Sequence, residues 1–294
     1  MARVKANGIE IEYESIGNEG DPTILLIMGL GAQLTLWPDS FCAGLAGRGF
    51  RVVRYDNRDV GLSTDFAAAG LPNFPAAFAN LMGGKKIDAP YRLPDMAKDA
   101  IGLLDALGID RAHMVGASMG GMIAQILAAD YPGRTRSLVS IMSTSGRMGL
   151  PPGKPEAMAM LMAQPEGPAR EQIIQHAMKL RTVIGSPGFA ADPAALRALV
   201  ERNVDRRYYP AGGARQYLAV MASGDRVELL KRVRVPTLVL HGADDPLIHP
   251  DGARDVAKLV PGAALEFYPG WGHDLPEQMV PVLVDRIARH YAAA

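Results

Sequence analysis

The chain has 294 residues, of which 48% are apolar, so it is long enough to bury one large core or a core with an inserted domain. Its 31 Lys and Arg balance 31 Asp and Glu, which gives no support for binding to nucleic acid or to a membrane surface. A single cysteine, Cys42, excludes a disulfide within the chain and favours a reducing, cytoplasmic location.

The N-terminal pattern predicts a β-hairpin. Apolar and polar residues alternate over 4–6 and 9–13, on either side of Asn7-Gly8, a pair that favours tight turns. With no apolar leader before this pattern, we expect no secretory signal. The continuous apolar run at 23–28 predicts a buried strand and is too short to span a membrane.

Strand and helix patterns alternate from there to about residue 144. The predicted helices cover 37–47, 94–107 and 119–130, and the predicted strands cover 51–54, 111–115 and 137–142. This alternation predicts a mostly parallel sheet with helices on both of its faces.

From about 145 to 232 the pattern is helical only, with helices expected over 156–162, 169–184, 194–203 and 214–223. The alternation then resumes, with strands at 236–240 and 264–267 and helices at 252–259 and 279–291. We therefore expect an eight-stranded α/β core domain, formed by 1–144 and 233–294, and an inserted helical cap domain at 145–232. The cap should cover the carboxyl ends of the strands, where open α/β sheets bind ligands.

The most informative motif is Gly-Ala-Ser-Met-Gly at 116–120, which lies between a predicted strand and a predicted helix. In that setting a Gly-x-Ser-x-Gly pattern indicates a strained turn that exposes Ser118 as a nucleophile, rather than a purely structural turn. The backbone N–H of Met119 would then stand at a helix N-terminus, where negative charge is favoured.

A nucleophilic serine needs an imidazole base that a carboxylate orients. Candidates for both partners follow later strands: Asp244 and Asp245 after 236–240, and His273 after 264–267. Parallel strands end at one sheet edge, so these side chains should approach Ser118. A turn-bracing role remains open for Asp244. The other histidines considered as bases are His113, His241 and His249, and we expect His113 to be a core residue.

These motifs resemble the α/β-hydrolase fold family over essentially the whole chain. The matching segments are the turn at 116–120, Gly-Ala-Asp-Asp-Pro at 242–246 and Gly-Trp-Gly-His at 270–273. Met-Gly-Leu-Gly at 28–31, Trp-Pro at 37–38 and the segment 54–63 are similar to the aclacinomycin methylesterase-like group of ester hydrolases. The resemblance implies that Asp245, which precedes proline, is the acid. It also implies an oxyanion hole formed by the N–H groups of Leu30 and Met119.

Four further residues are candidates for substrate binding. Met158 and Met162 belong to the predicted cap, and methionine adapts well to irregular apolar ligands. Trp37 and Trp271 are candidates for the walls of the site. Ordinary core packing is the alternative for all four.

We expect a serine hydrolase that needs no cofactor or metal and acts on small, largely apolar esters, with a homo-oligomer possible. The same three catalytic side chains also serve lactonases and hydrolases that cleave carbon–carbon bonds, because a fold does not decide among such activities. A burst with p-nitrophenyl acetate would favour the esterase, and turnover only of dienolic diketo acids would favour the carbon–carbon hydrolase. A ligand receptor on a hydrolase scaffold would show near-single-turnover hydrolysis.

Overall fold

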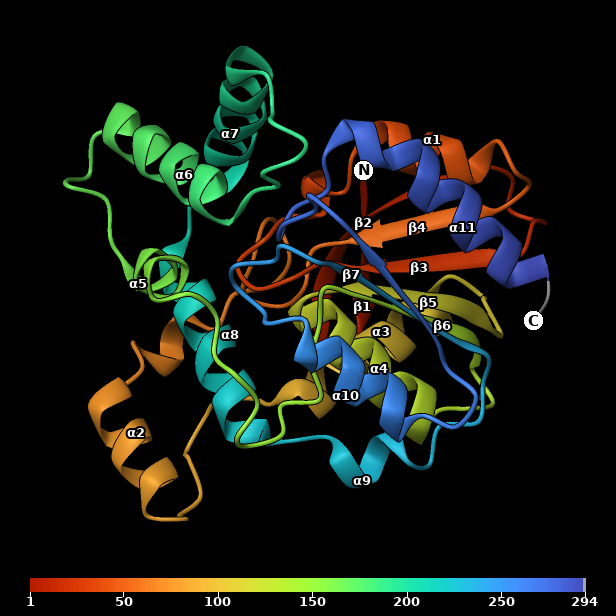
Figure 1. Cartoon of the computed structure of the whole chain (residues 1–294), viewed down its shortest axis with the longest axis horizontal. Helices are drawn as coiled ribbons and strands as arrows, with labels where there is room; N and C mark the ends of the chain where they lie inside the picture. The colour runs from red at the N-terminus through yellow and green to blue at the C-terminus, as the bar shows by residue number, and fades with distance from the viewer. Residues whose placement is uncertain (293–294) are drawn as a thin grey trace.

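The computed structural model describes residues 1–292, so the last two residues of the predicted core segment 233–294 lie outside the described part of the chain. Eight strands form one sheet in the order β1-β2-β4-β3-β5-β6-β7-β8 (Figure 1). Their bounds are β1 Ala2–Ala6, β2 Ile9–Ile16, β3 Thr23–Ile27, β4 Arg51–Tyr55, β5 Ala112–Ala117, β6 Thr135–Ile141, β7 Thr237–Gly242 and β8 Ala264–Tyr268. Strand β2 runs antiparallel to β1 and β4, and the other neighbouring pairs are parallel. The mostly parallel, eight-stranded sheet is confirmed.

Helices cover both faces of this sheet, as expected (Figure 1). One face carries α1 (Asp39–Ala46) and α11 (Val280–Ala292), and the other carries α3 (Leu93–Ala106), α4 (Met119–Asp130), α9 (Val227–Leu230) and α10 (Asp251–Leu259). Strand β3 shows why its run is apolar throughout. Leu25 and Ile27 enter the core on one face, while Ile24 and Leu26 enter the core on the other.

Four helices between β6 and β7 lie outside the two helical layers and are called the cap helices: α5 Pro155–Met162, α6 Arg170–Ile184, α7 Pro193–Arg207 and α8 Pro210–Ser223 (Figure 1). Three of them begin at a proline, where the missing N–H costs nothing. Helix α8 begins four residues before its predicted start at 214, because the glycine pair at 212–213 obscured its first turn.

Two helices were not predicted from the sequence: α2, and the four-residue α9 at Val227–Leu230. Helix α2 (Phe74–Met82) begins after Asn73, whose side chain accepts a hydrogen bond from the Ala76 N–H. Ala77 of α2 packs against Leu218 of α8. Much of the rest of α2 is exposed and apolar, so its sequence lacks the polar outer face by which a surface helix is recognised.

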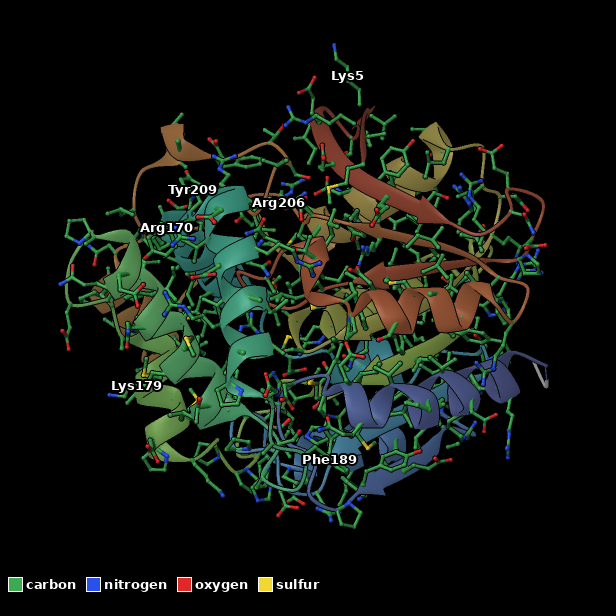
Figure 2. The ribbon with its side chains drawn as sticks, turned by 90° about the horizontal axis from the view of Figure 1, so that it is seen from above. Lys5, Arg170, Lys179, Phe189, Arg206 and Tyr209 are labelled. Atoms are coloured by element: carbon green, nitrogen blue, oxygen red, sulfur yellow. The ribbon has the colours of Figure 1, made fainter. Side chains whose placement is uncertain are left out.

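Buried polar contacts join the cap helices to the loop after β4. The Arg206 guanidinium lies between α7 and the core (Figure 2), where it pairs with Asp56 at 2.7 Å and donates to the side-chain oxygen of Gln33 at 2.6 Å. Arg215 of α8 contacts both carboxylate oxygens of Asp59. Over residues 1–292, none of the helices combines the length and apolar character that crossing a membrane requires.

Candidate active site

Ser118 occupies a strained turn between β5 and α4. Its φ of 55° and ψ of −120° lie in a region that costs a non-glycine residue about 1–3 kcal/mol. Two hydrogen bonds from β6 and the residues after it fix this turn. The Ser118 N–H donates to the Ile141 carbonyl at 2.9 Å, and the Ser143 hydroxyl donates to the Ser118 carbonyl at 2.8 Å.

The two glycines of the motif allow the strand and the helix to touch. A Cβ atom on Gly116 would collide with the backbone of Gly120, and a Cβ atom on Gly120 would collide with the Ile27 carbonyl of β3. Only glycine therefore fits at these positions, and the turn is clamped between its neighbours with the serine hydroxyl at the carboxyl edge of the sheet.

His273 links Ser118 to a carboxylate. Its Nε2 lies 3.0 Å from the Ser118 Oγ, and its Nδ1 lies 2.7 Å from Oδ2 of Asp245. Because an ionised carboxylate only accepts hydrogen bonds, Nδ1 carries the proton and Nε2 is free to accept the serine proton. The His273 backbone N–H donates to the Ile184 carbonyl at 2.7 Å, so the end of α6 holds this loop in place.

Asp245 is buried, and both of its carboxylate oxygens accept hydrogen bonds. Its Oδ1 accepts hydrogen bonds from the backbone N–H groups of Leu247 at 2.8 Å and Ile248 at 2.9 Å. Burial alone would raise the pKa of Asp245. The positive charge that His273 carries when it is protonated, and the hydrogen bonds from His241 and His273, outweigh that effect and hold the pKa of Asp245 well below its usual value. The carboxylate is therefore ionised at neutral pH.

The other residues considered from the sequence as the acid or the base form no hydrogen bond with Ser118. Asp244 accepts a hydrogen bond from the Gly270 N–H at 2.7 Å and so braces the loop that carries His273. His241 is fully buried, with Nε2 2.9 Å from the Ile248 carbonyl and 3.3 Å from Oδ2 of Asp245. His113 is buried near the opposite end of β5 and bonds to the Ser137 hydroxyl at 2.8 Å. His249 is partly exposed and lies beside Asp251, 3.5 Å from its carboxylate.

Two N–H groups were expected to form an oxyanion hole. That of Met119 is next to Ser118 in the sequence, and that of Leu30 belongs to a loop that lies beside Ser118 in space. Met119 is the first residue of α4, and the first N–H groups of a helix have no acceptor within it. A Cβ atom on Gly29 would lie 3.1 Å from the Ser118 Cβ, so the loop after β3 rests against the nucleophile. Among the hydrogen bonds of residues 1–292, neither the Leu30 nor the Met119 N–H has an acceptor.

The structure corrects two of the predicted substrate contacts. Trp37 is fully buried and stacks on Phe41, and Trp271 is fully buried against Tyr268. Neither ring presents surface to a ligand, because each fills the core under α1 and α11. Met158 and Met162 lie on α5, half-buried and exposed respectively.

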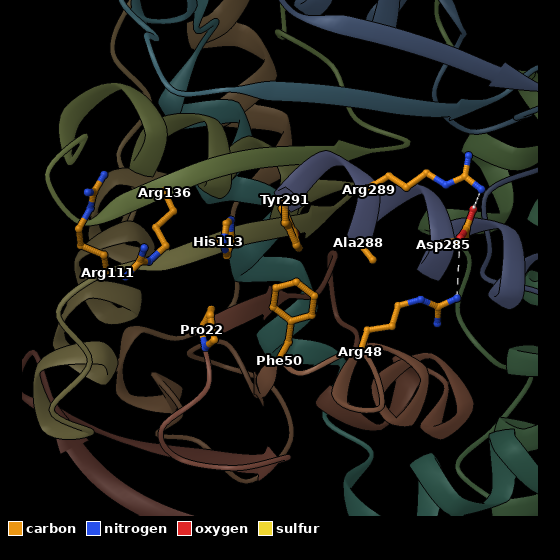
Figure 3. A pocket seen from close by; sticks show the side chains of 10 residues that line it. All are labelled: Pro22, Arg48, Phe50, Arg111, His113, Arg136, Asp285, Ala288, Arg289 and Tyr291. Atoms are coloured by element: carbon orange, nitrogen blue, oxygen red, sulfur yellow. Dashed lines mark ion pairs between the residues drawn. The ribbon is translucent and has the colours of Figure 1, made fainter. Parts of the chain in front are cut away.

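A cavity of about 590 Å³ lies away from this site (Figure 3). Its walls include Arg48, Arg111, Arg136 and Arg289, and Asp285 pairs with Arg289 at 2.8 Å. Arg111 immediately precedes β5, whereas Ser118 immediately follows it. The cavity therefore opens at the amino ends of the strands and does not include the candidate active site.

Sequence reasoning missed two side chains that hold the loop after β3. The Gln216 Oε1 accepts a hydrogen bond from the Gly31 N–H at 2.7 Å, and the Asn57 Nδ2 donates to the Met28 carbonyl at 2.9 Å. The sequence held one hint of this contact. Two adjacent glycines, Gly212 and Gly213, destabilise a helix, so their presence in α8 indicates that another part of the backbone approaches this helix closely.

Comparison with known proteins gives one family and several similar chains. The family model described as alpha/beta hydrolase fold matches residues 22–278. Rhodomycin D methylesterase DauP of Streptomyces sp. (strain C5) is 30% identical over 310 residues, covering 96% of this chain and 94% of that protein. The 3-oxoadipate enol-lactonase 2 of Acinetobacter baylyi is 27% identical over 249 residues, covering 82% of this chain and 78% of that protein.

A solved structure also superposes on the whole chain. The meta-cleavage product hydrolase from Pseudomonas fluorescens IP01 aligns with a TM-score of 0.75 and 19% identity, covering 100% of this chain and 98% of that one. At that identity the similarity concerns the fold.

Proposed function

This chain belongs to the α/β-hydrolase fold family, and from that premise we propose that it is a serine hydrolase that cleaves small, largely apolar carboxylic esters. The observation that carries the proposal is the hydrogen-bonded chain from Asp245 through His273 to Ser118, with distances of 2.7 and 3.0 Å. A carboxylate, an imidazole and a hydroxyl in this order form the arrangement that makes a serine nucleophilic at neutral pH.

In the proposed first half-reaction, the Ser118 Oγ forms a bond to the ester carbonyl carbon while His273 takes the hydroxyl proton at Nε2. Asp245 keeps the imidazole in the required tautomer and stabilises its protonated form. The carbonyl oxygen becomes an oxyanion that accepts hydrogen bonds from the Leu30 and Met119 N–H groups. When this intermediate collapses, the carbon–oxygen bond to the alcohol breaks and the alcohol leaves with the proton from His273.

The second half-reaction uses the same groups in reverse. Water gives a proton to His273 and attacks the acyl-enzyme carbonyl, which again places negative charge on the oxygen held by the two N–H groups. Ser118 then leaves, recovers the proton from His273, and the carboxylic acid departs. Each side chain ends in its starting protonation state, so the cycle needs no added reactant besides water.

We propose that residues 145–232, the segment of the cap helices, form a domain that closes the site and selects the substrate. Met158 and Met162 of α5 would then contact its apolar groups. Apolar fit of this kind discriminates only modestly between neighbouring homologues, by about 10- to 200-fold per methylene. Met158→Ala should therefore shift the preferred acyl length without abolishing turnover, and an unchanged profile would remove Met158 from the substrate contacts.

A lactone is the second candidate substrate. The supporting observation is the 27% identical relative named as an enol-lactonase, and a lactone is a cyclic ester that the same steps would open. Structural similarity to a carbon–carbon hydrolase at 19% identity supports the fold and gives no reason to prefer that reaction.

The experiment is a panel of p-nitrophenyl acetate, butyrate and octanoate, a carboxylic methyl ester and a simple lactone, assayed with the wild type and Ser118→Ala. Ser118→Ala should lower kcat/KM on every hydrolysed substrate by roughly 10⁴-fold or more. Ser137→Ala is the matched control, since this buried serine bonds to His113 away from the site. Full activity in Ser118→Ala would refute the proposed function.

We also propose a cytoplasmic location, which the lone, buried Cys42 supports. Association into a homo-oligomer is a further proposal, for which light scattering on the purified chain gives a direct measurement.

A further inference from the structure

Helix α8 of the cap lies directly against the loop that carries Leu30. A Cβ atom on Gly31 would lie 3.8 Å from the Gly213 Cα, and a Cβ atom on Gly212 would collide with the Asp59 carbonyl. At Gly212 the helix backbone thus approaches the loop after β4 to a distance that a side chain would prevent, whereas Gly213 and Gly31 are in ordinary van der Waals contact.

This approach brings one side chain between the two loops. Gln216 is fully buried, and both ends of its amide are bonded to core backbone. Its Oε1 accepts from the Gly31 N–H at 2.7 Å, and its Nε2 donates to the Arg58 carbonyl at 2.7 Å. The amide therefore ties the loop after β3 to the loop after β4.

The bonded groups lie on both sides of the proposed oxyanion donor. Asn57 holds the Met28 carbonyl, which belongs to the peptide before the one that carries the Leu30 N–H. Gln216 holds the Gly31 N–H, which belongs to the peptide after it. The peptide between these two has no bond at its N–H, and its carbonyl, that of Gly29, accepts a hydrogen bond from the Ala32 N–H at 3.3 Å. The bonds on either side therefore restrict the direction in which the Leu30 N–H points.

We infer that Gln216 is a positioning residue for ester hydrolysis: from the cap, it orients the Leu30 N–H toward the oxyanion that forms at Ser118. This inference rests on the proposed function. It makes α8 part of the catalytic apparatus rather than only a cover over the substrate, because the oxyanion hole is complete only when this helix is seated on the core.

A buried ion pair keeps the helix seated. Arg215, the residue before Gln216, donates to both carboxylate oxygens of Asp59 at 2.7 and 2.8 Å. It also donates to the Tyr209 hydroxyl at 2.6 Å and to the Gly70 carbonyl at 2.9 Å. These four bonds fix the turn of α8 from which Gln216 reaches the loop.

The test compares Gln216→Met with Asn203→Ala. Methionine fills the same space without hydrogen bonds. Asn203 accepts from the Thr35 hydroxyl at 2.7 Å, a contact between cap and core that does not touch residues 28–31. Each variant is assayed for kcat and KM on p-nitrophenyl butyrate. Each is also titrated with a trifluoromethyl ketone, which forms a tetrahedral serine adduct and so requires the oxyanion hole.

Gln216→Met should lower kcat by roughly 10- to 100-fold, a part of the 10²–10³ lost when an oxyanion donor is removed outright. Its KM should stay within about threefold, and its affinity for the trifluoromethyl ketone should fall by the same factor as kcat. Asn203→Ala should behave as the wild type in all three measurements. If Gln216→Met does not fold, Gln216→Asn decides by the same criteria, because the shorter amide cannot reach both partners.

A folded Gln216 variant that keeps wild-type kcat and inhibitor affinity would overturn the inference. So would an equal loss in Asn203→Ala, which would mean that loosening the cap anywhere has this effect. Both results leave the proposed function standing, since that depends on Ser118→Ala being inactive in the same assay.

Discussion

Replacing Arg215 by methionine tests how much the buried ion pair contributes to stability. The Arg215 side chain is 2% exposed and that of Asp59 is fully buried. The substitution leaves the Asp59 carboxylate with two remaining donors, the Tyr91 hydroxyl and the Phe66 N–H, both at 2.7 Å. Removing one partner of a buried pair costs about 3–5 kcal/mol because the other charge stays buried. Since two donors remain, we expect a loss near the lower end, about 3 kcal/mol.

The chain offers a matched control on its surface. Arg170 contacts both oxygens of Asp205 at 2.7 Å, the same two-point geometry, but both side chains are more than half exposed. Arg170→Met should leave the stability nearly unchanged, because water already solvates and screens that pair. Urea unfolding followed by circular dichroism at pH 7 gives the free energy of unfolding of each variant. Equal losses in the two variants would refute the reasoning from burial.

Three further predictions concern the site and the core. Asp245→Asn should lower kcat by about 10⁴-fold, because an amide does not hold the required tautomer of His273. Asp244→Asn should keep most of the activity. If a steady-state assay shows the larger loss in Asp244→Asn, then Asp244 is the catalytic acid. Gly120→Ala should give little folded protein, because its Cβ collides with the backbone of β3, and a stable, active variant would contradict this. Burial and the charges of nearby basic groups lower the pKa of His113 to about 4, so it is neutral in the folded state at pH 5 and above. Because the unfolded chain binds a proton at His113 more readily than the folded protein does, the free energy of unfolding falls as the pH drops from the ordinary pKa near 6.5 toward 4. Above pH 6.5 this loss is absent. His113→Gln should therefore reduce the loss of unfolding free energy between pH 7 and pH 4.5 by about 2 kcal/mol, and an unchanged pH dependence would contradict it.

The sheet was predictable because its signals are local. A strand such as β3, buried on both faces, must be apolar along its whole length, and the turns between strands and helices require glycine or proline. The positions of Ser118, Asp245 and His273 after three parallel strands predicted that their side chains would lie at one edge. Only coordinates supply the distances between them.

The rest depends on neighbours that are distant in sequence. Trp37 and Trp271 lie close in sequence to motifs of the predicted site. Whether their rings face a ligand or the core depends on how α1 and α11 pack against the sheet. Gln216 lies 185 residues from Gly31, and no periodicity connects them. Helix α2 escaped prediction because its exposed apolar residues break the amphipathic pattern.

Acylation of the Ser118 Oγ is the central claim, and one measurement tests it directly. The purified wild type is treated with a fluorophosphonate, which reacts covalently with an activated serine, and the labelled peptide is identified by mass spectrometry. We predict one label, on Ser118, with loss of esterase activity in proportion to labelling. An enzyme that still hydrolyses esters after full labelling, or a label on another residue, would contradict the central claim.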